Sequence, residues 1–311
     1  MNNTPLVSII TVNYNRLQDT IELFESIGKI TYSNIELILI DNGSDDDLAL
    51  LERKFPNLRL IKNENNLGFA AANNIGIKLA KGKYILLINN DVIVTPDFLT
   101  SLVRKLEKEQ SIGIVSPKIY YYYIPEMIQY AGFTDINPIT IRNKGIGFNE
   151  LESGKYDEEK ETYYAHGAAF LFRSELIDKI GFMSEIFFLY YEEMDWCKRV
   201  RNSGYKIYYI PQSIIYHKDS ATTGADSPLK TYYLNRGRLI YMRRNVKFPL
   251  LILSGLYQVL FAFPKNYLRL LIQKKWTHAH AYKNAFLWFY KHFFSKKILV
   301  DQFKFDLDRR L

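Results

Sequence analysis

The first ninety residues alternate between short, continuously apolar runs and segments with helical periodicity. The runs that favour strands are residues 7–12, 35–40, 58–61 and 84–88, and the helix-like segments are residues 69–80 and a stretch that ends at Gly28. Strands that are apolar throughout and separated by helices are typical of a parallel sheet covered on both faces. We therefore predict an α/β fold with a Rossmann-like, mostly parallel sheet flanked by helices.

Polar turn residues follow each of these four predicted strands. They are residues 13–15, 41–44, 63–68 and 89–91, which are rich in Asn, Asp and Gly. One such cluster alone is equally well explained as an ordinary tight turn. Open sheets of this kind bind ligands beyond the carboxyl ends of their strands. Four polar clusters in succession at one edge therefore indicate a ligand cleft.

The middle of the chain is less regular. Residues 113–164 follow no clear period, and residues 142–161 have the polar, glycine-containing composition of a mobile loop. Residues 167–173 then favour a strand, with Ser174 as the expected cap of a short helix. A helix is predicted over residues 192–203, and a strand over residues 205–210 that Pro211 should stop.

Net charge is distributed very unevenly. Residues 227–300 contain 14 Lys or Arg and no Asp or Glu, and residues 301–311 carry three charges of each sign. Subtracting these 14 charges from the total of +8 leaves a net charge of −6 for residues 1–226. The chain has one cysteine, Cys197, which is compatible with a reducing compartment. Residues 1–12 show no basic segment and no cleavage site of a signal peptide, so we expect a cytoplasmic protein.

Six segments, in this order and at this spacing, resemble the inverting glycosyltransferase family 2. They are residues 7–15, 38–44, 66–70, 85–91, 167–173 and 191–196. Within the family, the chain is most similar to bacterial rhamnosyltransferase-like enzymes of surface-polysaccharide synthesis. The resemblance implies the GT-A fold over residues 1–226, with a nucleotide-binding half (1–112) and an acceptor-binding half (113–226). Residues 227–311 would form a helical extension.

The resemblance places a divalent cation beside the segment Asn89-Asn90-Asp91, where relatives carry an Asp-x-Asp motif. The first acid is absent here, so Asp91 is the expected metal ligand. Relatives often have a histidine at the position of His217 that reaches the metal or the diphosphate. Hard cations such as Mg²⁺ or Mn²⁺ prefer oxygen ligands and neutralise a leaving diphosphate. The alternatives are a plain polar turn at residues 89–91 and a packing role for His217.

The same resemblance assigns the nucleotide-sugar pocket. Asp41 and Asn42 are expected to contact the base and ribose, because a carboxylate accepts from a pyrimidine N–H or from ribose hydroxyls. The remaining expected donor-site residues are Asn13, Tyr14, Asn66, Gly68, Asn89, Asn90 and Gly167. Two of them have an alternative explanation: Asn66 is as well placed to cap the following helix, and Gly167 could belong to the sheet core.

The catalytic base is expected in the acidic segment Glu192-Glu193-Met194-Asp195. Family members carry a carboxylate at this point that takes the proton from the attacking acceptor hydroxyl. Glu193 aligns with that position, and Glu192 is the second choice. Without the resemblance, acids favoured at a helix N-terminus by the helix dipole would explain the same residues.

The basic C-terminal quarter favours a membrane surface. The apolar run 248–263 is shorter than the roughly 20 residues that span a bilayer. The basic and aromatic segment 276–294 that follows suits an amphipathic helix in the membrane interface. A helical appendage packed on the catalytic domain, or an oligomer interface, is the alternative. We therefore expect a protein held peripherally at the inner face of the cell membrane.

The predicted function is a metal-dependent, inverting hexosyltransferase of polysaccharide or cell-wall synthesis. Its donor would be dTDP-rhamnose or a UDP-hexose, and its acceptor a glycan or a polyprenyl-linked saccharide. Two alternatives remain: a non-catalytic homologue that binds sugar nucleotides, and a nucleic-acid-binding protein with a basic tail. Residues 1–226 have a net negative charge and carry acids at the strand ends. Both features argue against a nucleic-acid partner.

Overall fold

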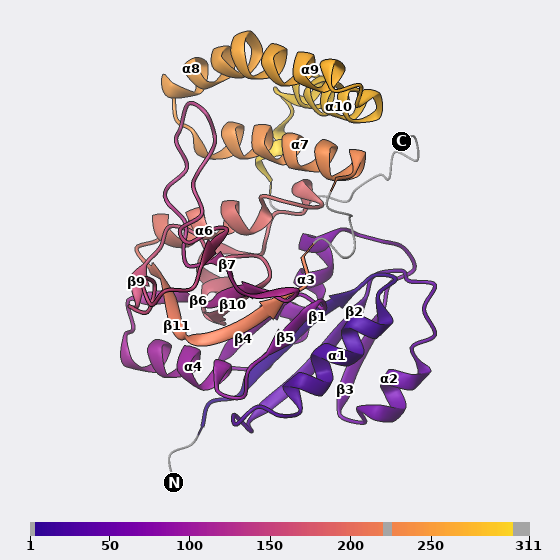
Figure 1. The fold of residues 1–311 in the computed structure, drawn as a ribbon, viewed down its shortest axis with the longest axis vertical. Coiled ribbons are helices and arrows are strands. Elements are labelled where there is room, and N and C mark those ends of the chain that lie inside the picture. The colour runs from indigo at the N-terminus through magenta and orange to yellow at the C-terminus, as the bar shows by residue number, and fades with distance from the viewer. Residues whose placement is uncertain (1–3, 220–225, 301–311) are drawn as a thin grey trace.

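The four apolar runs at the N-terminus form four adjacent parallel strands. A computed structural model describes residues 4–219 and 226–300. In it, these strands lie in the order β3-β2-β1-β4. Their bounds are Val7–Asn13 for β1, Ile35–Asp41 for β2, Leu58–Lys62 for β3 and Tyr84–Ile88 for β4. All four carboxyl ends therefore reach the same edge of the sheet, as predicted (Figure 1).

The sheet continues beyond β4 in the order β10-β6-β11-β5. These strands are β10 (Ala169–Arg173), β6 (Ile112–Tyr121), β11 (Lys206–His217) and β5 (Val92–Val94). Strands β10 and β5 run antiparallel to their neighbours, whereas β6 and β11 are parallel to each other. Six of the eight strands on this path therefore share one direction, which confirms the mostly parallel sheet. The short strands β7 (Ile124–Tyr130), β8 (Glu150–Leu151) and β9 (Lys160–Glu161) pair beside it.

Helices cover both faces of the sheet, because the inner strands present apolar side chains on both sides. In β1, Val7 and Ile9 belong to one buried cluster and Ile10 to the other. The first cluster is covered by α1 (Leu17–Ile27), α2 (Ala49–Lys54) and α4 (Phe98–Lys108). The second is covered by α3 (Phe69–Leu79), α5 (Leu176–Ile180), the short helix η1 (Glu185–Phe187) and α6 (Glu192–Asn202).

Two local predictions are wrong. Strand β11 does not stop at Pro211 but continues to His217, with its register against β6 shifted between Ile210 and Ile214. Such an irregularity accommodates a proline, which has no N–H for the ladder. Ser174 does not cap α5: the N-cap position is Glu175, and the Ser174 hydroxyl donates to the carbonyl of Lys83 at 3.0 Å.

Residues 142–161, which resemble a mobile loop in sequence, carry several tertiary anchors. The short strands β8 and β9 pair with β7 and β11. The buried Lys118 ammonium holds Glu152 at 2.7 Å and Asp157 at 2.6 Å. The segment is therefore fastened to the sheet at both of its strands.

The C-terminal part is helical, as predicted. It contains α7 (Pro228–Asn245), α8 (Leu250–Tyr257), the π-helical turn η2 (Gln258–Ala262), α9 (Phe263–Ile272), α10 (Trp276–His292) and η3 (Lys296–Leu299). Its last predicted residues, 301–311, lie outside the described part. Leu239, Ile240 and Phe289 belong to the same buried cluster as α3 and α6. The domain boundary at residue 226 stays a prediction, but the apolar core crosses it.

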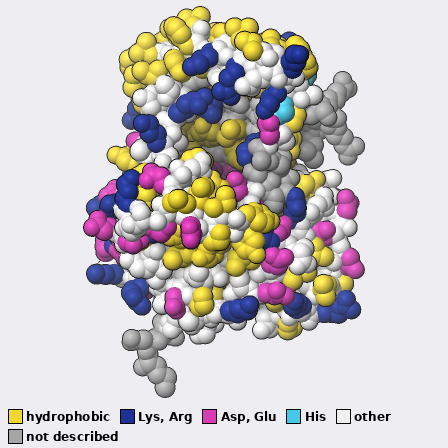
Figure 2. Space-filling model, in the orientation of Figure 1, with side chains coloured by type: hydrophobic (Ala, Val, Ile, Leu, Met, Phe, Trp, Pro, Cys, Tyr) yellow, Lys and Arg dark blue, Asp and Glu magenta, His cyan; other side chains and the backbone are white. Residues whose placement is uncertain are grey.

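The helices α8 to α10 form the outer layer of the molecule (Figure 1). Helix α10 buries Tyr282, Phe286 and Phe289 against the rest of the protein. This agrees with the alternative prediction for this segment, a helical appendage that packs on the catalytic domain. Exposed apolar side chains are more numerous along residues 248–272, and Figure 2 shows apolar side chains at the top of this face. No helix in residues 4–219 and 226–300 is long and apolar enough to cross a bilayer.

Candidate active site

A cavity of about 520 Å³ lies at the carboxyl edge of the sheet, where α6 and α7 face β1 and β4. Most of the residues expected to bind the nucleotide sugar, the metal or the acceptor line this cavity. They are Tyr14, Asn42, Asn66, Gly68, Asn89, Asn90, Asp91, Gly167, Glu192, Glu193 and His217. The antiparallel direction of β10 brings Gly167 to this edge, and the parallel direction of β11 brings His217. Side chains far apart in sequence therefore meet in one pocket.

Asn13 and Asp41 do not line the cavity. Both are buried beneath it, where the Asn13 amide donates to the Asp41 carboxylate at 3.1 Å and to the Ser44 hydroxyl at 3.0 Å. Asp41 also accepts from the backbone N–H of Ser44 at 3.3 Å. This network orders the turn after β2, next to the pocket. A direct contact of either residue with a nucleotide stays a prediction.

Asn42 and Asn66 order the loop before α3. The Asn42 amide donates to the Asn66 side-chain oxygen at 2.9 Å, and the Asn42 side-chain oxygen accepts from the N–H of Leu67 at 3.0 Å. The N-cap position of α3 is Gly68, so Asn66 is not the helix cap. It accepts instead from the Gly68 N–H at 2.9 Å. Both asparagines also line the cavity.

Asp91 and His217 form a buried pair at the opposite side of the cavity from Glu193. The His217 Nε2 atom lies 3.1 Å from Asp91 Oδ1, and His217 Nδ1 lies 2.8 Å from the Gln129 side-chain oxygen. Because an amide oxygen only accepts, Nδ1 carries the hydrogen. The Nε2 lone pair of a neutral imidazole then faces a carboxylate oxygen. Two acceptors at this distance repel unless a cation or a further proton lies between them.

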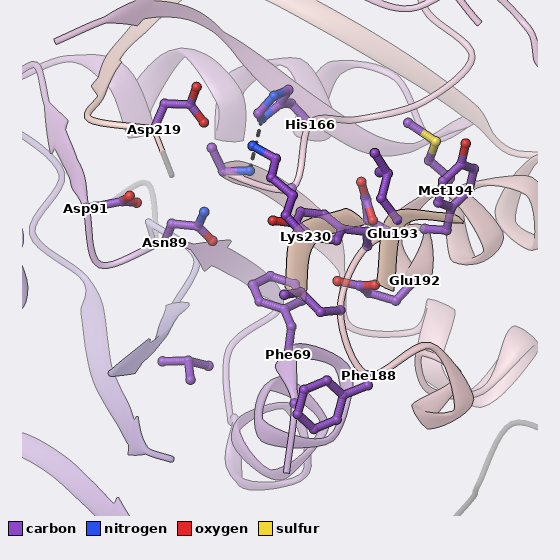
Figure 3. Close-up of a pocket in the computed structure, with 18 of the residues that line it drawn as sticks. Phe69, Asn89, Asp91, His166, Phe188, Glu192, Glu193, Met194, Asp219 and Lys230 are labelled. Atoms are coloured by element: carbon purple, nitrogen blue, oxygen red, sulfur yellow. Dashed lines mark hydrogen bonds between the residues drawn. The ribbon is translucent and has the colours of Figure 1, made fainter. Parts of the chain in front are cut away.

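This donor set fits a divalent cation held jointly with a ligand. In the described part of the chain, no three His, Cys, Asp or Glu side chains cluster closely enough to hold a metal by themselves. An imidazole nitrogen and a carboxylate oxygen would supply two ligands, and phosphate oxygens are common further ligands of Mg²⁺ and Mn²⁺. Asp219 lines the cavity on the same side as Asp91 (Figure 3).

His166 is held beside this pair in one tautomer. Its Nδ1 accepts from the backbone N–H of Ala168 at 3.1 Å, so its other nitrogen carries the hydrogen. Burial, followed by the nearby His217, lowers the pKa of His166 to about 3. A neutral imidazole N–H is therefore available to a ligand in the cavity.

Glu192 and Glu193 occupy the first turn of α6. Figure 3 shows Glu193 across the cavity from Asp91, with the Lys230 side chain between them. Removal from water raises the pKa of Glu193 to about 7. The pKa of Glu192 is raised well above its usual range, by burial and then by the charge of Glu193, and its Oε2 has no hydrogen-bond partner among the described residues. Glu193 is thus the carboxylate suited to accept a proton near neutral pH.

The loop before α6 is strained and tightly packed. Phe188, Tyr190 and Tyr191 all have positive φ angles, between 65° and 77°, which L-residues adopt only under structural constraint. A Cβ on Gly68 would stand 2.5 Å from the Phe188 carbonyl, and a Cβ on Gly237 would stand 2.6 Å from the Tyr190 carbonyl. The glycines let α3 and α7 hold this loop from two sides, which fixes where α6 begins.

Asp195 anchors α6 to α7. Its buried carboxylate accepts from Arg244 Nε at 2.9 Å and from a terminal Arg244 nitrogen at 3.1 Å, and it accepts from the Asn245 amide at 2.8 Å. Nearby in α7, Arg236 is 1% exposed and donates to the carbonyls of Ile186 and Phe187. At least two basic residues of the C-terminal quarter therefore stabilise the fold of the site.

Replacing Asp195 by asparagine should destabilise the protein. Removing one partner of a buried ion pair leaves the other charge uncompensated, which costs about 3–5 kcal/mol. The midpoint of thermal unfolding should fall by roughly 10 °C. Calorimetry of Asp195→Asn beside Glu25→Gln, which removes an exposed partner of Lys54, measures the difference. Equal midpoints for the two variants would contradict the anchoring role.

The sequence patterns did not indicate several residues of the cavity wall. Lys230 comes from α7, and Phe188 comes from the strained loop before α6. Nothing in the sequence distinguishes Lys230 from the other basic residues of its segment. Asp219 follows His217 by two positions, so its place in the cavity wall could have been predicted from its closeness in sequence to a predicted site residue.

Comparisons with known proteins agree with this geometry. The sequence profile described as glycosyl transferase family 2 matches residues 8–181. An uncharacterized protein, y4gI of Sinorhizobium fredii, is 31% identical over 266 residues, which cover 79% of this chain and 28% of that protein. A low-salt glycan biosynthesis hexosyltransferase, Agl10 of Haloferax volcanii, is 25% identical over 208 residues, which cover 65% of this chain and 63% of that protein. The chain thus spans less than two thirds of either relative.

Among solved structures, the chain is similar to GalNAc-T7, whose crystal structure contains UDP, GalNAc and Mn²⁺. The TM-score is 0.63 at 17% sequence identity, and the match covers 78% of this chain and 48% of that one. At this identity the likeness concerns the fold, and it confirms the predicted GT-A architecture.

Proposed function

The chain belongs to glycosyl transferase family 2, and on that premise we propose that it transfers a sugar from a nucleoside diphosphate to an acceptor hydroxyl with inversion. One observation carries the proposal: Glu193, a carboxylate whose pKa is raised to about 7, lies across one cavity from the Asp91–His217 pair. A single displacement needs a proton acceptor on one side of the sugar and charge stabilisation on the other.

Each step of this displacement has a residue to support it. The acceptor oxygen forms a bond to the anomeric carbon of the donor sugar, and its proton passes to Glu193. The bond between the anomeric carbon and the diphosphate oxygen breaks, and the electron pair leaves with the nucleoside diphosphate. Lys230 lines the same cavity and is placed to offset the charge that develops on the diphosphate.

Asp91 and His217 would hold a divalent cation, Mg²⁺ or Mn²⁺, at the diphosphate. Such a cation supplies neutralisation of the leaving group's charge. Gln129 would fix the imidazole by accepting from its Nδ1–H, the arrangement that commonly orients histidine ligands. The similarity to a fold that binds UDP with Mn²⁺ supports this assignment.

The proposed donor is dTDP-rhamnose or a UDP-hexose. The resemblance to rhamnosyltransferase-like sequences favours the first, and the likeness to a UDP-binding fold favours the second. The proposed acceptor is a glycan or a polyprenyl-linked saccharide of a surface polysaccharide. Release of nucleoside diphosphate from a panel of donor sugars, with Mn²⁺ and then with EDTA, tests the proposal. No release from any donor by folded protein would instead favour a non-catalytic homologue.

The rate should rise with pH through neutrality. Because the pKa of Glu193 is raised to about 7, the carboxylate is largely protonated at pH 6 and cannot accept the acceptor's proton. The profile of kcat/KM, which reports groups of the free enzyme, should therefore climb about tenfold per pH unit below 7 and level off above. The rising part of this pH profile should be absent in Glu193→Gln. A profile that is flat from pH 5 to pH 8 in the wild type would argue against this base.

We also propose that the protein binds the inner membrane surface through residues 248–272. Leu260 and Phe261 are 60% and 64% exposed on η2, in a row of exposed apolar side chains along residues 248–272. Figure 2 shows apolar side chains at the top of this face, above a band of Lys and Arg. The absence of acids in residues 227–300 complements anionic lipid headgroups. A peripheral location at the membrane would bring the active site to lipid-linked acceptors.

Polar substitutions in this row should weaken membrane binding. Because burying each large apolar side chain contributes about 1.5–3 kcal/mol, Leu260→Ser with Phe261→Ser should lower partitioning roughly tenfold or more. Flotation with phosphatidylcholine–phosphatidylserine vesicles measures the change. Phe148→Ser, at a side chain that is 54% exposed on the catalytic part, is the matched control. Equal flotation of the double variant and the control would exclude this surface.

A further inference from the structure

A second cavity, of about 310 Å³, lies beside the active-site cavity, between α7, α9 and α10. Lys230 and Leu234 of α7 line both cavities. The first turns of α7 are therefore a shared wall, and a ligand in the second cavity would lie next to the pocket that contains Glu193.

The second cavity is strongly basic. Arg142, Arg238 and Arg269 line it from three separate elements. Asp226 is the one acid among its described lining residues, and it is already paired with Lys275 at 2.6 Å. Three arginines thus line the cavity, and no further carboxylate occurs among its described lining residues. Converging cations of this kind favour a multiply charged anion as the ligand.

Arg238 is preorganised for such a ligand. Its Nε donates to the Tyr191 hydroxyl at 3.1 Å, and its Nη1 donates to the Asn235 side-chain oxygen at 2.8 Å. Its Nη2 has no acceptor among the described residues. Tyr191 directly precedes Glu192, so the anion site is connected to the start of the catalytic helix.

Helix α9 joins this cavity to the apolar surface. Its Arg269 lines the cavity, whereas Leu268 and Ile272 are 56% and 80% exposed. The order from the outside inward is therefore apolar surface, arginine-lined cavity and catalytic pocket. A molecule with a lipid tail, a phosphate and a sugar would meet these three environments in that order.

We propose that the second cavity binds the phosphate or diphosphate group of the acceptor while the acceptor's sugar hydroxyl reaches Glu193. This inference rests on the proposed function, and it adds that the acceptor is an anionic phosphate ester. A neutral sugar carries no charge for three arginines to neutralise, whereas arginine forks match phosphate oxygens. The phosphate belongs either to a polyprenyl-linked saccharide or to a soluble phosphorylated glycan.

Titration calorimetry with inorganic pyrophosphate in EDTA tests the anion site. The affinity should fall at least tenfold in Arg142→Ala with Arg269→Ala. It should stay unchanged in Asp91→Asn and in the control Lys265→Ala with Lys283→Ala, which removes equal charge from exposed positions outside the cavity. An unchanged affinity in the arginine variant, or binding that requires metal and Asp91, would overturn the inference. Nucleotide binding with Mn²⁺, measured on the same arginine variant, tests the donor site separately.

Vesicles distinguish the two sources of the phosphate. Phosphatidylcholine vesicles that contain polyprenyl phosphate should recruit the wild type more strongly than pure phosphatidylcholine vesicles if the acceptor is lipid-linked. This gain should disappear in the arginine variant. Arginine-dependent pyrophosphate binding without such a gain supports a soluble phosphorylated acceptor. If polyprenyl phosphate increased vesicle binding equally for the wild type and the arginine variant, phosphate binding in the second cavity would be contradicted.

Discussion

Replacing Glu193 by glutamine is expected to lower kcat about 10³-fold while leaving donor binding intact. General-base catalysis contributes roughly 10²–10⁴-fold, and glutamine keeps the size of the side chain but cannot take the acceptor's proton. The nucleotide affinity should change little, because Glu193 lies across the cavity from Asp91, which pairs with His217. Initial rates of nucleoside diphosphate release, together with titration of the nucleotide, separate the two effects.

The matched control is Glu192→Gln. Burial and the neighbouring Glu193 raise the pKa of Glu192 well above its usual range, which favours the protonated, neutral form of this carboxyl. A neutral glutamine is then a close replacement, and the loss should stay within about tenfold. The reverse ranking of the two variants would assign the base to Glu192. Full turnover in Glu193→Gln would remove Glu193 from the mechanism.

Replacing Asp91 by asparagine should reduce kcat/KM about 10³-fold and abolish its dependence on Mn²⁺ or Mg²⁺. Asn89 and Asn90 already supply neutral amides at this turn, so Asp91 is its one negative charge. A cation held by a single carboxylate and a single imidazole should lose most of its affinity when that carboxylate becomes an amide. Rates measured across a metal titration would show the change.

Asp178→Asn serves as the control, because it removes an equal charge at an exposed position of α5 outside the cavity. Its metal response should match the wild type. If Asp91→Asn kept the wild-type metal response, the cation would have to bind elsewhere. If the wild type turned over equally well in EDTA, charge neutralisation of the diphosphate would rest on Lys230 and the surrounding amides.

The N-terminal half of the sheet, β1 to β4, was predictable because local pattern and tertiary structure agree there. Apolar runs such as residues 84–88 are strands buried on both faces, and parallel strands bring their carboxyl ends together. The polar residues after them therefore had to meet, and Asn42 and Asp91 do line one cavity. Asn13 shows the limit of such a prediction. Its position after a strand does not reveal whether its side chain lines the pocket or is hydrogen-bonded beneath it.

The cavity wall formed by α6, α7 and the loop before α6 was less predictable because long-range packing determines it. The positive φ angles at Phe188 and Tyr191 depend on contacts with α3 and α7, which no local pattern encodes. The basic quarter indicated a membrane surface as a whole, yet Arg236 and Arg244 are structural and Lys230 lines the candidate site cavity. Pro211 likewise suggested a strand end, where a shift of register lets β11 continue to His217.

The most direct test of the account is a calorimetric titration of nucleoside diphosphates into the wild-type protein with Mn²⁺ and with EDTA. We predict that UDP or dTDP binds with Mn²⁺, that EDTA weakens the affinity at least tenfold, and that Asp91→Asn removes this difference. Binding of the nucleotide that is identical in Mn²⁺ and EDTA would contradict the cation site. No binding of any nucleoside diphosphate to folded protein would contradict the proposed transferase function.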